Sequence, residues 1–272
     1  MTNALALLNP TQELSELELM IMGEMEQEDN SFDLIPTKIK IGSGGINQFV
    51  TSTDETMKEF TGIVAVSQKA RAYWPPSENR DMPPLCISAD GQTGNFNTTP
   101  TDEQMFAAIK QRSVHSGVKA IDNGQNPAPT YACATCPLSQ WGSSDKGKGQ
   151  ACKSMRRLVV LVDGWTAPAL LTLPPTSVKV WDGYASALQN KRSAYFAIRT
   201  NFALEKQKSN GGDPYSMIKV VAAGPLDKVQ LGAVLEIRKQ YGDFVRSMAV
   251  DNDEYDTAPR ADADADEEIA PF

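Results

Sequence analysis

The placement of the four cysteines constrains this chain more than any other feature. All four lie in residues 75–152, a segment rich in Pro, Gly, Asn and Asp with little apolar periodicity. A loop of that length inside a folded domain needs a cross-link to hold it. Cys133 and Cys136 are separated by two residues, Cys136 and Cys152 by fifteen, and Cys86 and Cys133 by 46. This spacing predicts a closed, structural Zn²⁺ site whose four thiolate ligands are Cys86, Cys133, Cys136 and Cys152.

Other uses of these cysteines fit the sequence less well. A thioredoxin-like redox pair needs a βαβ context that the pattern around Cys133 lacks, and disulfides are rare in intracellular chains. A catalytic zinc deaminase needs a His-x-Glu pattern, but the one histidine, His115, is followed by Ser and Gly. A single histidine also disfavours hydrolase triads, and residues 42–45 lack the Lys of a phosphate-binding loop. We therefore expect a binding protein, not an enzyme, in which zinc contributes folding energy.

The rest of the chain is patterned mainly for β-strands, in runs that alternate apolar and polar residues or are short and apolar. Strands are expected at 37–41, 63–74, 157–162, 167–173, 194–206 and 215–223. Apolar residues at helical spacing predict helices at about 175–190 and 226–245. The set predicts a mainly β fold with flanking helices. Its expected form is a partly closed, OB-fold-like barrel with a zinc-stapled insertion at about 75–155.

Charge is segregated along the chain. The net charge is −8, yet residues 1–33 hold eight acidic and no basic residues, and residues 249–272 hold nine acidic residues and one Arg. The body, 34–248, therefore has 25 basic and 17 acidic residues, a net charge of +8. Such a body is typical of proteins that displace counterions from a nucleic-acid backbone. We expect an acidic N-terminal arm or docking helix (1–33), the body, and a disordered acidic tail (249–272).

Single strands are bound by aromatic rings that stack on bases and by cations that follow phosphates. Strand alternation places Lys69, Arg71 and Tyr73 on one face. It also separates Tyr195 and Arg199 from the apolar residues of the same strand, Phe196, Ile198, Phe202 and Leu204, which we expect in the core. The predicted DNA contacts are Lys38, Lys40, Lys69, Arg71, Tyr73, Trp141, Arg156, Arg157, Tyr195, Arg199, Lys206, Lys208 and Lys219.

The last seven residues, Asp266-Glu267-Glu268-Ile269-Ala270-Pro271-Phe272, resemble the tip of bacterial single-stranded DNA-binding proteins. Those proteins end in acidic residues, an aliphatic residue, Pro and Phe; here one Ala is inserted before the Pro. In that family the tip binds replication and repair proteins. The resemblance implies the same role for Asp266, Glu267, Glu268, Ile269, Pro271 and Phe272. A zinc site in a DNA-binding body is also similar to the helix-destabilising proteins of T-even phages, which use a His ligand where this chain has four cysteines.

Together these features predict a sequence-independent single-stranded DNA-binding protein of replication, recombination or repair, which recruits partners through its tail. The tail is expected to compete with phosphates for the basic body. Two alternatives stay open: a zinc-stapled phage regulator that binds a host protein without touching DNA, and a strand-annealing protein. No apolar run reaches the roughly 20 residues that span a bilayer, and no basic residue precedes Lys38. The expected location is the cytoplasm of a bacterial host cell.

Overall fold

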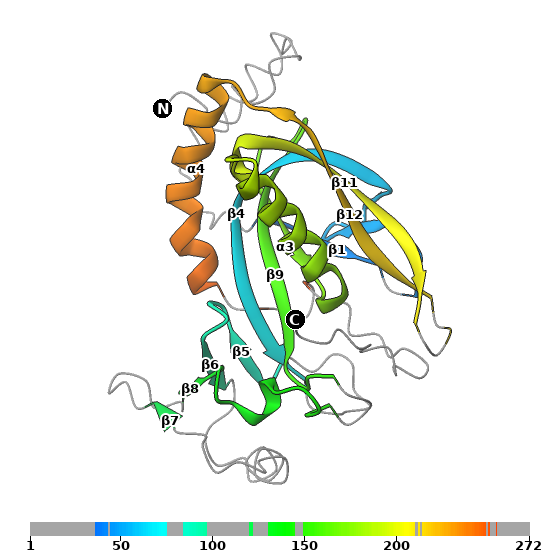
Figure 1. Cartoon of the computed structure of the whole chain (residues 1–272), viewed down its shortest axis with the longest axis vertical. Helices are drawn as coiled ribbons and strands as arrows, with labels where there is room; N and C mark the ends of the chain where they lie inside the picture. Colours follow the sequence, from blue (N-terminus) through cyan, green and yellow to red (C-terminus); the bar gives the residue numbers. More distant parts are fainter. Residues whose placement is uncertain are drawn as a thin grey trace.

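The computed structural model describes residues 36–42, 44–74, 84–96, 120–121, 130–144, 149–209, 212, 214–248, 250 and 254. Within them the chain forms a curled, mixed β-sheet with two long helices, which confirms the expected mainly β architecture with flanking helices (Figure 1). The 1–33 arm, His115 and the tip 266–272 lie outside the described residues. None of the described helices is long and apolar enough to cross a membrane.

The strands follow one path in which all pairs are antiparallel except β1 with β10. The path runs β3-β2-β1-β10-β9-β4-β5-β6-β8-β7, and the β11–β12 hairpin joins it through β4. The strands are β1 (Thr37–Ile41), β2 (Phe49–Thr51), β3 (Thr56–Met57), β4 (Glu59–Tyr73), β5 (Cys86–Ser88), β6 (Thr93–Phe96), β7 (Ala120–Ile121), β8 (Thr130–Ala132), β9 (Lys153–Val162), β10 (Ala169–Leu173), β11 (Ile198–Lys208) and β12 (Pro214–Pro225). The helices are α3 (Pro175–Asn190) and α4 (Lys228–Ser247), with short 3-10 turns η2 (Pro137–Ser139) and η3 (Tyr195–Ala197).

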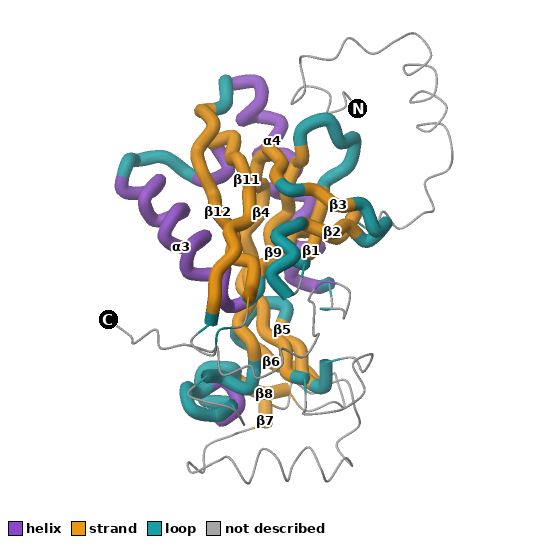
Figure 2. Tube along the Cα trace, turned by 90° about the vertical axis from the view of Figure 1, so that its right-hand side faces the viewer, coloured by secondary structure: helices purple, strands orange, loops and turns teal. Residues whose placement is uncertain are grey.

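The long strand β4 connects the two parts of the sheet (Figure 2). One of its edges pairs with β9 along most of its length, with a bulge between Val64 and Val66. Its other edge pairs first with β11 and, further along, with β5. The first half of β4 therefore belongs to the path β3-β2-β1-β10-β9-β4-β11-β12. The second half carries an extension, β5-β6-β8-β7, which begins at Cys86.

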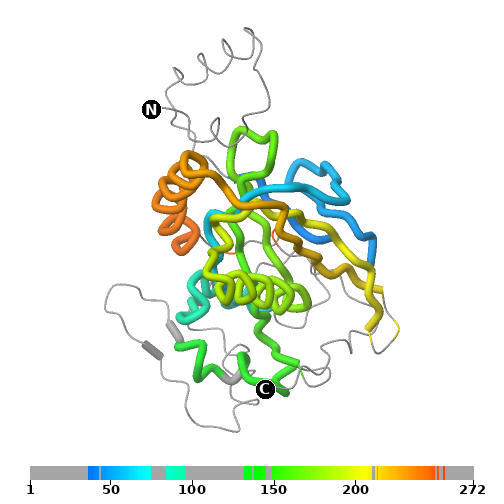
Figure 3. Tube along the Cα trace, turned by 45° about the horizontal axis from the view of Figure 1, so that its top comes forward, coloured from blue at the N-terminus to red at the C-terminus, as the bar shows by residue number. Residues whose placement is uncertain are grey.

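The eight-strand path curls into a half-barrel whose two lips approach each other. The β1–β2 loop lies beside the β11–β12 hairpin, as the blue and yellow segments show in Figure 3. There the backbone N–H of Asn47 donates to Ser216 Oγ at 3.0 Å. Gly45 has φ +71°, and a Cβ added to it would stand 2.8 Å from the Cβ of Pro214. Only glycine fits this close approach without strain.

Helix α3 covers the concave side of the half-barrel. Trp181, 1% exposed, belongs to the same apolar cluster as Ile39, Leu171 and Phe202, which come from both lips and from the floor of the sheet. The indole Nε1 of Trp181 donates to Ser67 Oγ at 2.9 Å. Burial of a side chain of this size contributes several kcal/mol, so α3 fixes the curl of the sheet.

Helix α4 covers the opposite, convex side. It begins with a capping box. The Asp227 side chain accepts from the backbone N–H groups of Val229 and Gln230, and the Gln230 side chain accepts from the backbone N–H of Asp227. Its buried residues Val234, Ile237 and Val245 pack in one cluster with apolar residues of β4, β9 and β10. The structure therefore confirms both expected helices, 175–190 and 226–245, to within two residues at either end.

After α4 the chain returns to the sheet, which corrects the predicted boundary between body and tail at residue 248. Val250 is 2% exposed and packs with Ala70, Ala72 and Met155 of the convex face. Glu254 is 1% exposed and belongs to the fold as well. These two residues belong to the body. The remaining residues of the predicted tail, from 255 onward, lie outside the described residues.

Candidate functional site

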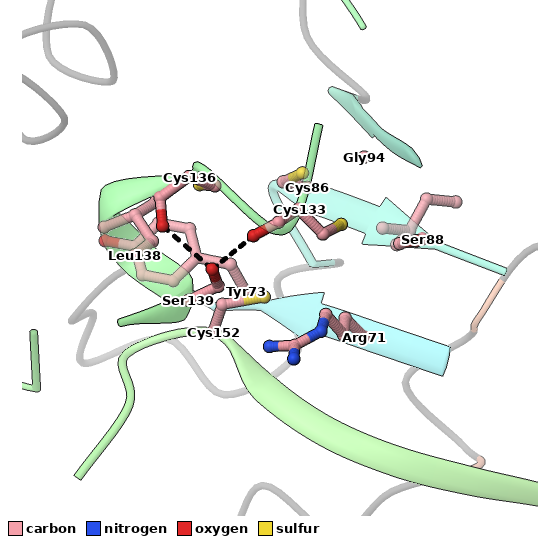
Figure 4. Close-up of a pocket in the computed structure, with 11 residues that line it drawn as sticks. Arg71, Tyr73, Cys86, Ser88, Gly94, Cys133, Cys136, Leu138, Ser139 and Cys152 are labelled. Atoms are coloured by element: carbon pink, nitrogen blue, oxygen red, sulfur yellow. Dashed lines mark hydrogen bonds between the residues drawn. The ribbon is translucent and has the colours of Figure 1, made fainter. Parts of the chain in front are cut away.

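The four cysteines line one small cavity in the extension, as the sequence spacing predicts (Figure 4). Cys86 begins β5, Cys133 follows β8, Cys136 precedes η2, and Cys152 precedes β9. All four are free thiols. The cavity has a free volume of about 10 Å³, enough for one water-sized particle. Residues separated by up to 66 positions in the chain therefore meet at a site with room for a single ion.

A tightly hydrogen-bonded segment presents three of these cysteines. We call residues 133–144 and 149–152 the knuckle. The Ser139 hydroxyl donates to the carbonyl oxygens of Cys133 and Cys136, and the backbone N–H of Cys152 donates to the Leu138 carbonyl at 2.8 Å. Leu138, 1% exposed, packs against Tyr73 at the end of β4. The knuckle is thereby fastened to the sheet by apolar contact and closed on itself by hydrogen bonds.

Hydrogen-bond donors converge on three of the four sulfurs. Arg71 donates to Cys152, the Ser88 hydroxyl contacts Cys133, and the backbone N–H of Leu138 donates to Cys136. The Ser139 N–H donates instead to the carbonyl oxygen of Cys136 at 3.0 Å. Burial nevertheless raises the pKa of each thiol above its ordinary value, and raises that of Cys152 to about 12. Burial raises the pKa of Cys86 furthest, and the three other thiols raise it again because like charges would gather in one cavity.

The zinc prediction is compatible with this chemistry, but the structure does not test it. As the side chains stand, no three His, Cys, Asp or Glu residues in the described part of the chain form a metal-binding group. The four thiols around one cavity, and the donors aimed at their sulfurs, match the ligand type and the outer shell that a tetrahedral thiolate site needs.

Trp141 stands at the exposed end of the knuckle. Its side chain is 57% exposed, which is unusual for the largest aromatic residue. The backbone around it is fixed, because Gly142 and Ser144 both donate to the Gly149 carbonyl, at 3.0 and 3.1 Å. The Ser143 hydroxyl, in turn, donates to the Leu138 carbonyl at 2.9 Å. The fold therefore holds an indole ring in solvent on a rigid support.

Seven of the ten predicted cationic contacts fall into two groups. Lys69, Lys206 and Lys208 have exposed side chains, and Lys40 is half-buried. Three others are bound to acidic neighbours: Arg156 to both oxygens of Asp182 at 2.8 and 2.7 Å, Arg199 to Asp163, and Lys219 to Glu205 at 2.8 Å. The paired cations carry less attraction for phosphate than their number suggests, because their charges are already compensated.

Buried side chains correct three of the predicted DNA contacts. Lys38 is 8% exposed, Tyr73 is 2% exposed and Arg157 is fully buried. Tyr73 packs under the knuckle against Leu138, so its ring offers no face for a base. Arg157 points to the convex side, where Glu254 binds it. These side chains hold the fold together.

Tyr195 is a fourth correction. Residues 195–197 form the 3-10 turn η3 where the sequence predicts a strand, so the alternation of faces does not extend to them. Tyr195 packs against Trp181 on the concave side, and its hydroxyl accepts from Arg238 at 2.9 Å. Phe196 instead packs on the α4 side, 4.4 Å beneath the Arg238 guanidinium. Tyr195 is a packing residue whose polar atom is already bound.

Sequence reasoning missed the residues that support the cysteine cluster. Ser88 and Ser139 lie in ordinary loop-like sequence, and nothing in their spacing marks them. Ser139 follows Cys136 by three residues, which is the distance at which a side chain can reach back over a turn, and this is the one signal that was available. Comparison with protein-family models, with curated proteins and with solved structures finds no match to this chain.

Proposed function

We propose that this protein binds single-stranded DNA without regard to sequence. The observation that carries the proposal is Trp141, a largely exposed indole on a rigid knuckle. Stacking on an aromatic ring suits any base, since every base has a π-face, and contributes roughly 1–3 kcal/mol per base. Because the backbone that carries this ring is already fixed, base stacking has to order only the side chain.

Exposed cations supply the second part of the proposed interface. The knuckle packs on Tyr73, and Lys69 lies four residues earlier on the same face of β4. Residues on the same face of a strand follow one another at about 7 Å. The distance from Lys69 to the knuckle is therefore short enough for a few nucleotides of one DNA strand to span it. Lys206 and Lys208 add exposed charge on the β11 arm of the hairpin. These three lysines, not the full set expected from sequence, are the phosphate contacts we assign.

The revised boundary of the body changes the charge argument without reversing it. Residues 34–254 hold 25 basic and 20 acidic residues, a net charge of +5, and residues 255–272 hold six acidic residues and one Arg, a net charge of −5. We infer that the acidic segment competes with DNA for the body and that its tip recruits replication or repair proteins. The resemblance of residues 266–272 to bacterial single-stranded DNA-binding proteins supports the second role.

The OB-fold-like barrel remains part of this proposal. The half-barrel is curled and partly closed, as that fold requires, but its path has eight strands and includes the parallel β1–β10 pair. We infer that the five strands of an OB-like barrel form part of this larger sheet. The proposal depends on the exposed knuckle and lysines, and not on the barrel type.

Intrinsic fluorescence tests the proposal directly. Of the four tryptophans, Trp181 is buried and Trp141 is the most exposed, so bases that stack on Trp141 should quench part of the emission. We expect oligo-dT to quench the wild-type protein at low salt, with affinity falling as salt rises. The Trp141→Phe variant should lose that quenching. If oligo-dT does not quench the emission and labelled oligo-dT does not bind the protein at low salt, the proposal is rejected. If duplex DNA binds as well as oligo-dT, the single-strand preference is rejected.

A further inference from the structure

The donors around the cysteine cluster point to thiolates as the charge state for which the site is built. A protonated thiol is a weak acceptor, and a thiolate is a strong one. Yet the Cys136 sulfur receives a backbone N–H from Leu138, and Cys152 receives a guanidinium N–H from Arg71. Donors placed at these sulfurs are typical of a site that holds them as metal-bound thiolates. Burial opposes that charge in the absence of a cation.

Arg71 supplies an independent observation. Its side chain lines the cavity with the four cysteines, and its Nη1 atom is buried without a hydrogen-bond partner among the described residues. A buried, unpaired N–H of a charged group costs more free energy than that of a neutral one. The strand holds the residue in place, because Arg71 pairs with Ser88 of β5 on one side and Ser154 of β9 on the other. The guanidinium therefore needs an anionic partner within the cavity.

We propose that Cys86, Cys133, Cys136 and Cys152 bind one divalent, thiophilic metal ion, with Zn²⁺ as the expected occupant, and that Arg71 is the outer-shell counter-charge of the resulting tetrathiolate. Four thiolates and one divalent cation leave a net charge of −2 in a buried site. The Arg71 guanidinium compensates half of it, and its Nη1 gains a thiolate acceptor. The metal explains both the buried Arg71 Nη1 without a partner and the gathering of four thiols around one cavity.

The prediction from sequence that Arg71 contacts DNA is corrected as well, because its side chain lines the cavity and its guanidinium faces the cysteine cluster (Figure 4).

The test measures metal binding alone, without DNA. The metal content of the purified wild-type protein is measured by elemental mass spectrometry. The metal is then removed with a chelator under reducing conditions, and the metal-free protein is titrated with Co²⁺. We expect one metal ion per chain, and visible and charge-transfer bands of tetrahedral cobalt thiolate. Arg71→Met should keep the stoichiometry, weaken Co²⁺ binding roughly 10- to 100-fold in chelator competition, and shift the thiolate charge-transfer band. Arg71→Lys should recover part of the affinity.

The matched control is Lys69→Met, which removes a cation two residues away on the same face of β4 but outside the cavity. It should bind Co²⁺ as the wild type does. The metal-free proteins give a further readout of opposite sign. Without the metal-bound thiolates, the buried Nη1 atom of Arg71 has no anionic partner in the cavity, so metal-free Arg71→Met should melt no lower than the metal-free wild type. A folded wild type that binds no metal, or that carries a Cys133–Cys136 disulfide, overturns the metal centre. Equal Co²⁺ affinity in Arg71→Met and Lys69→Met overturns the role of Arg71. Neither result bears on the binding of oligo-dT.

Discussion

Arg157 and Glu254 form a bidentate ion pair in which both side chains have 0% exposure and both N···O distances are 2.9 Å. The pair is satisfied on every side. The Arg157 Nη1 also donates to the carbonyl oxygens of Val245 and Met248, and the Thr172 hydroxyl donates to Glu254 at 3.0 Å. The network joins β9, β10, the end of α4 and the segment after it. It fixes where the acidic C-terminal residues leave the body.

Truncation at two positions is therefore expected to give opposite results. A chain that ends after Ala258 keeps Glu254, so it should melt as the full chain does while binding oligo-dT more tightly at low salt, because it lacks most of the acidic segment. A chain that ends after Val250 leaves the buried charge of Arg157 without its carboxylate, which should cost about 3–5 kcal/mol of unfolding free energy. Chemical denaturation and oligo-dT titration of both chains measure the two effects.

A double substitution separates the effect of the unpaired charge from the effect of lost packing. Glu254→Ala should destabilise the protein as strongly as the truncation after Val250, whereas replacing Arg157 and Glu254 together by Met removes both charges and should cost far less. Equal loss in the single and double variants would show that packing, and not the unpaired charge, determines the effect.

Trp141 is expected to contribute to DNA affinity and not to stability. Because its side chain is 57% exposed, Trp141→Ala should leave the melting temperature within about 1 °C. Loss of one stacking contact should weaken oligo-dT binding roughly tenfold, and Trp141→Phe should retain most of the affinity. Fluorescence anisotropy of labelled oligo-dT measures both variants, which also separates affinity from the change in tryptophan emission. Unchanged affinity in Trp141→Ala would remove the knuckle from the interface.

Lys69, Lys206 and Lys208 are expected to act through phosphate charge alone. Each Lys→Gln substitution should lower the slope of log affinity against log salt by about 0.7, the value for one contact on a single strand. The control is Lys239→Gln on α4, which is exposed and lies on the convex side. A slope that falls equally for the control would show that the effect reflects net charge and not a contact.

The sequence predicts the secondary structure well because its apolar pattern reflects the two faces of the sheet. Strand 37–41 and helix 175–190 agree with the expected bounds, since Thr37, Ile39 and Ile41 alternate cleanly and Pro175 marks a helix start. Cysteine spacing likewise predicts which four residues meet. The apolar pattern of a strand or helix is local in the sequence, and four cysteines have few possible partners. Both can therefore be interpreted without the structure.

The identity of exposed cations could not be predicted in the same way. Arg156 and Arg157 read as one basic run, yet they point to opposite faces of β9 and each meets a carboxylate far along the chain, Asp182 and Glu254. Strand alternation gives the face of a residue but not what covers that face. Both faces of this sheet are covered, by α3 and by α4 with the segment after it. A basic residue on such a sheet is as easily an internal ion pair as a phosphate contact.

Asp90 provides a prediction for pH. Its carboxylate holds the β5–β6 turn, where Oδ1 accepts from the backbone N–H groups of Gln92 and Thr93 at 2.7 and 2.8 Å and from the Ser88 hydroxyl at 3.0 Å. Partial burial alone would raise the pKa of Asp90, but these hydrogen bonds outweigh it and hold the pKa below its ordinary value. The stabilisation is therefore present above the unfolded pKa of about 3.9 and is lost as pH falls through the lower, folded value.

Asp90→Asn is expected to remove this acid dependence. Asparagine keeps one acceptor oxygen but no charge, so the variant should be less stable than the wild type at neutral pH, by about 1 kcal/mol or less, and the difference should close as the medium becomes acidic. Urea unfolding of both proteins from pH 7 to about pH 3 measures it, and the difference at each pH cancels the protonation of the thiols, which both proteins share. The exposed Asp243→Asn on α4 is the control and should show no such closing difference. A gap between wild type and Asp90→Asn that stays constant with pH would mean that the turn depends on the shape of the side chain and not on its charge.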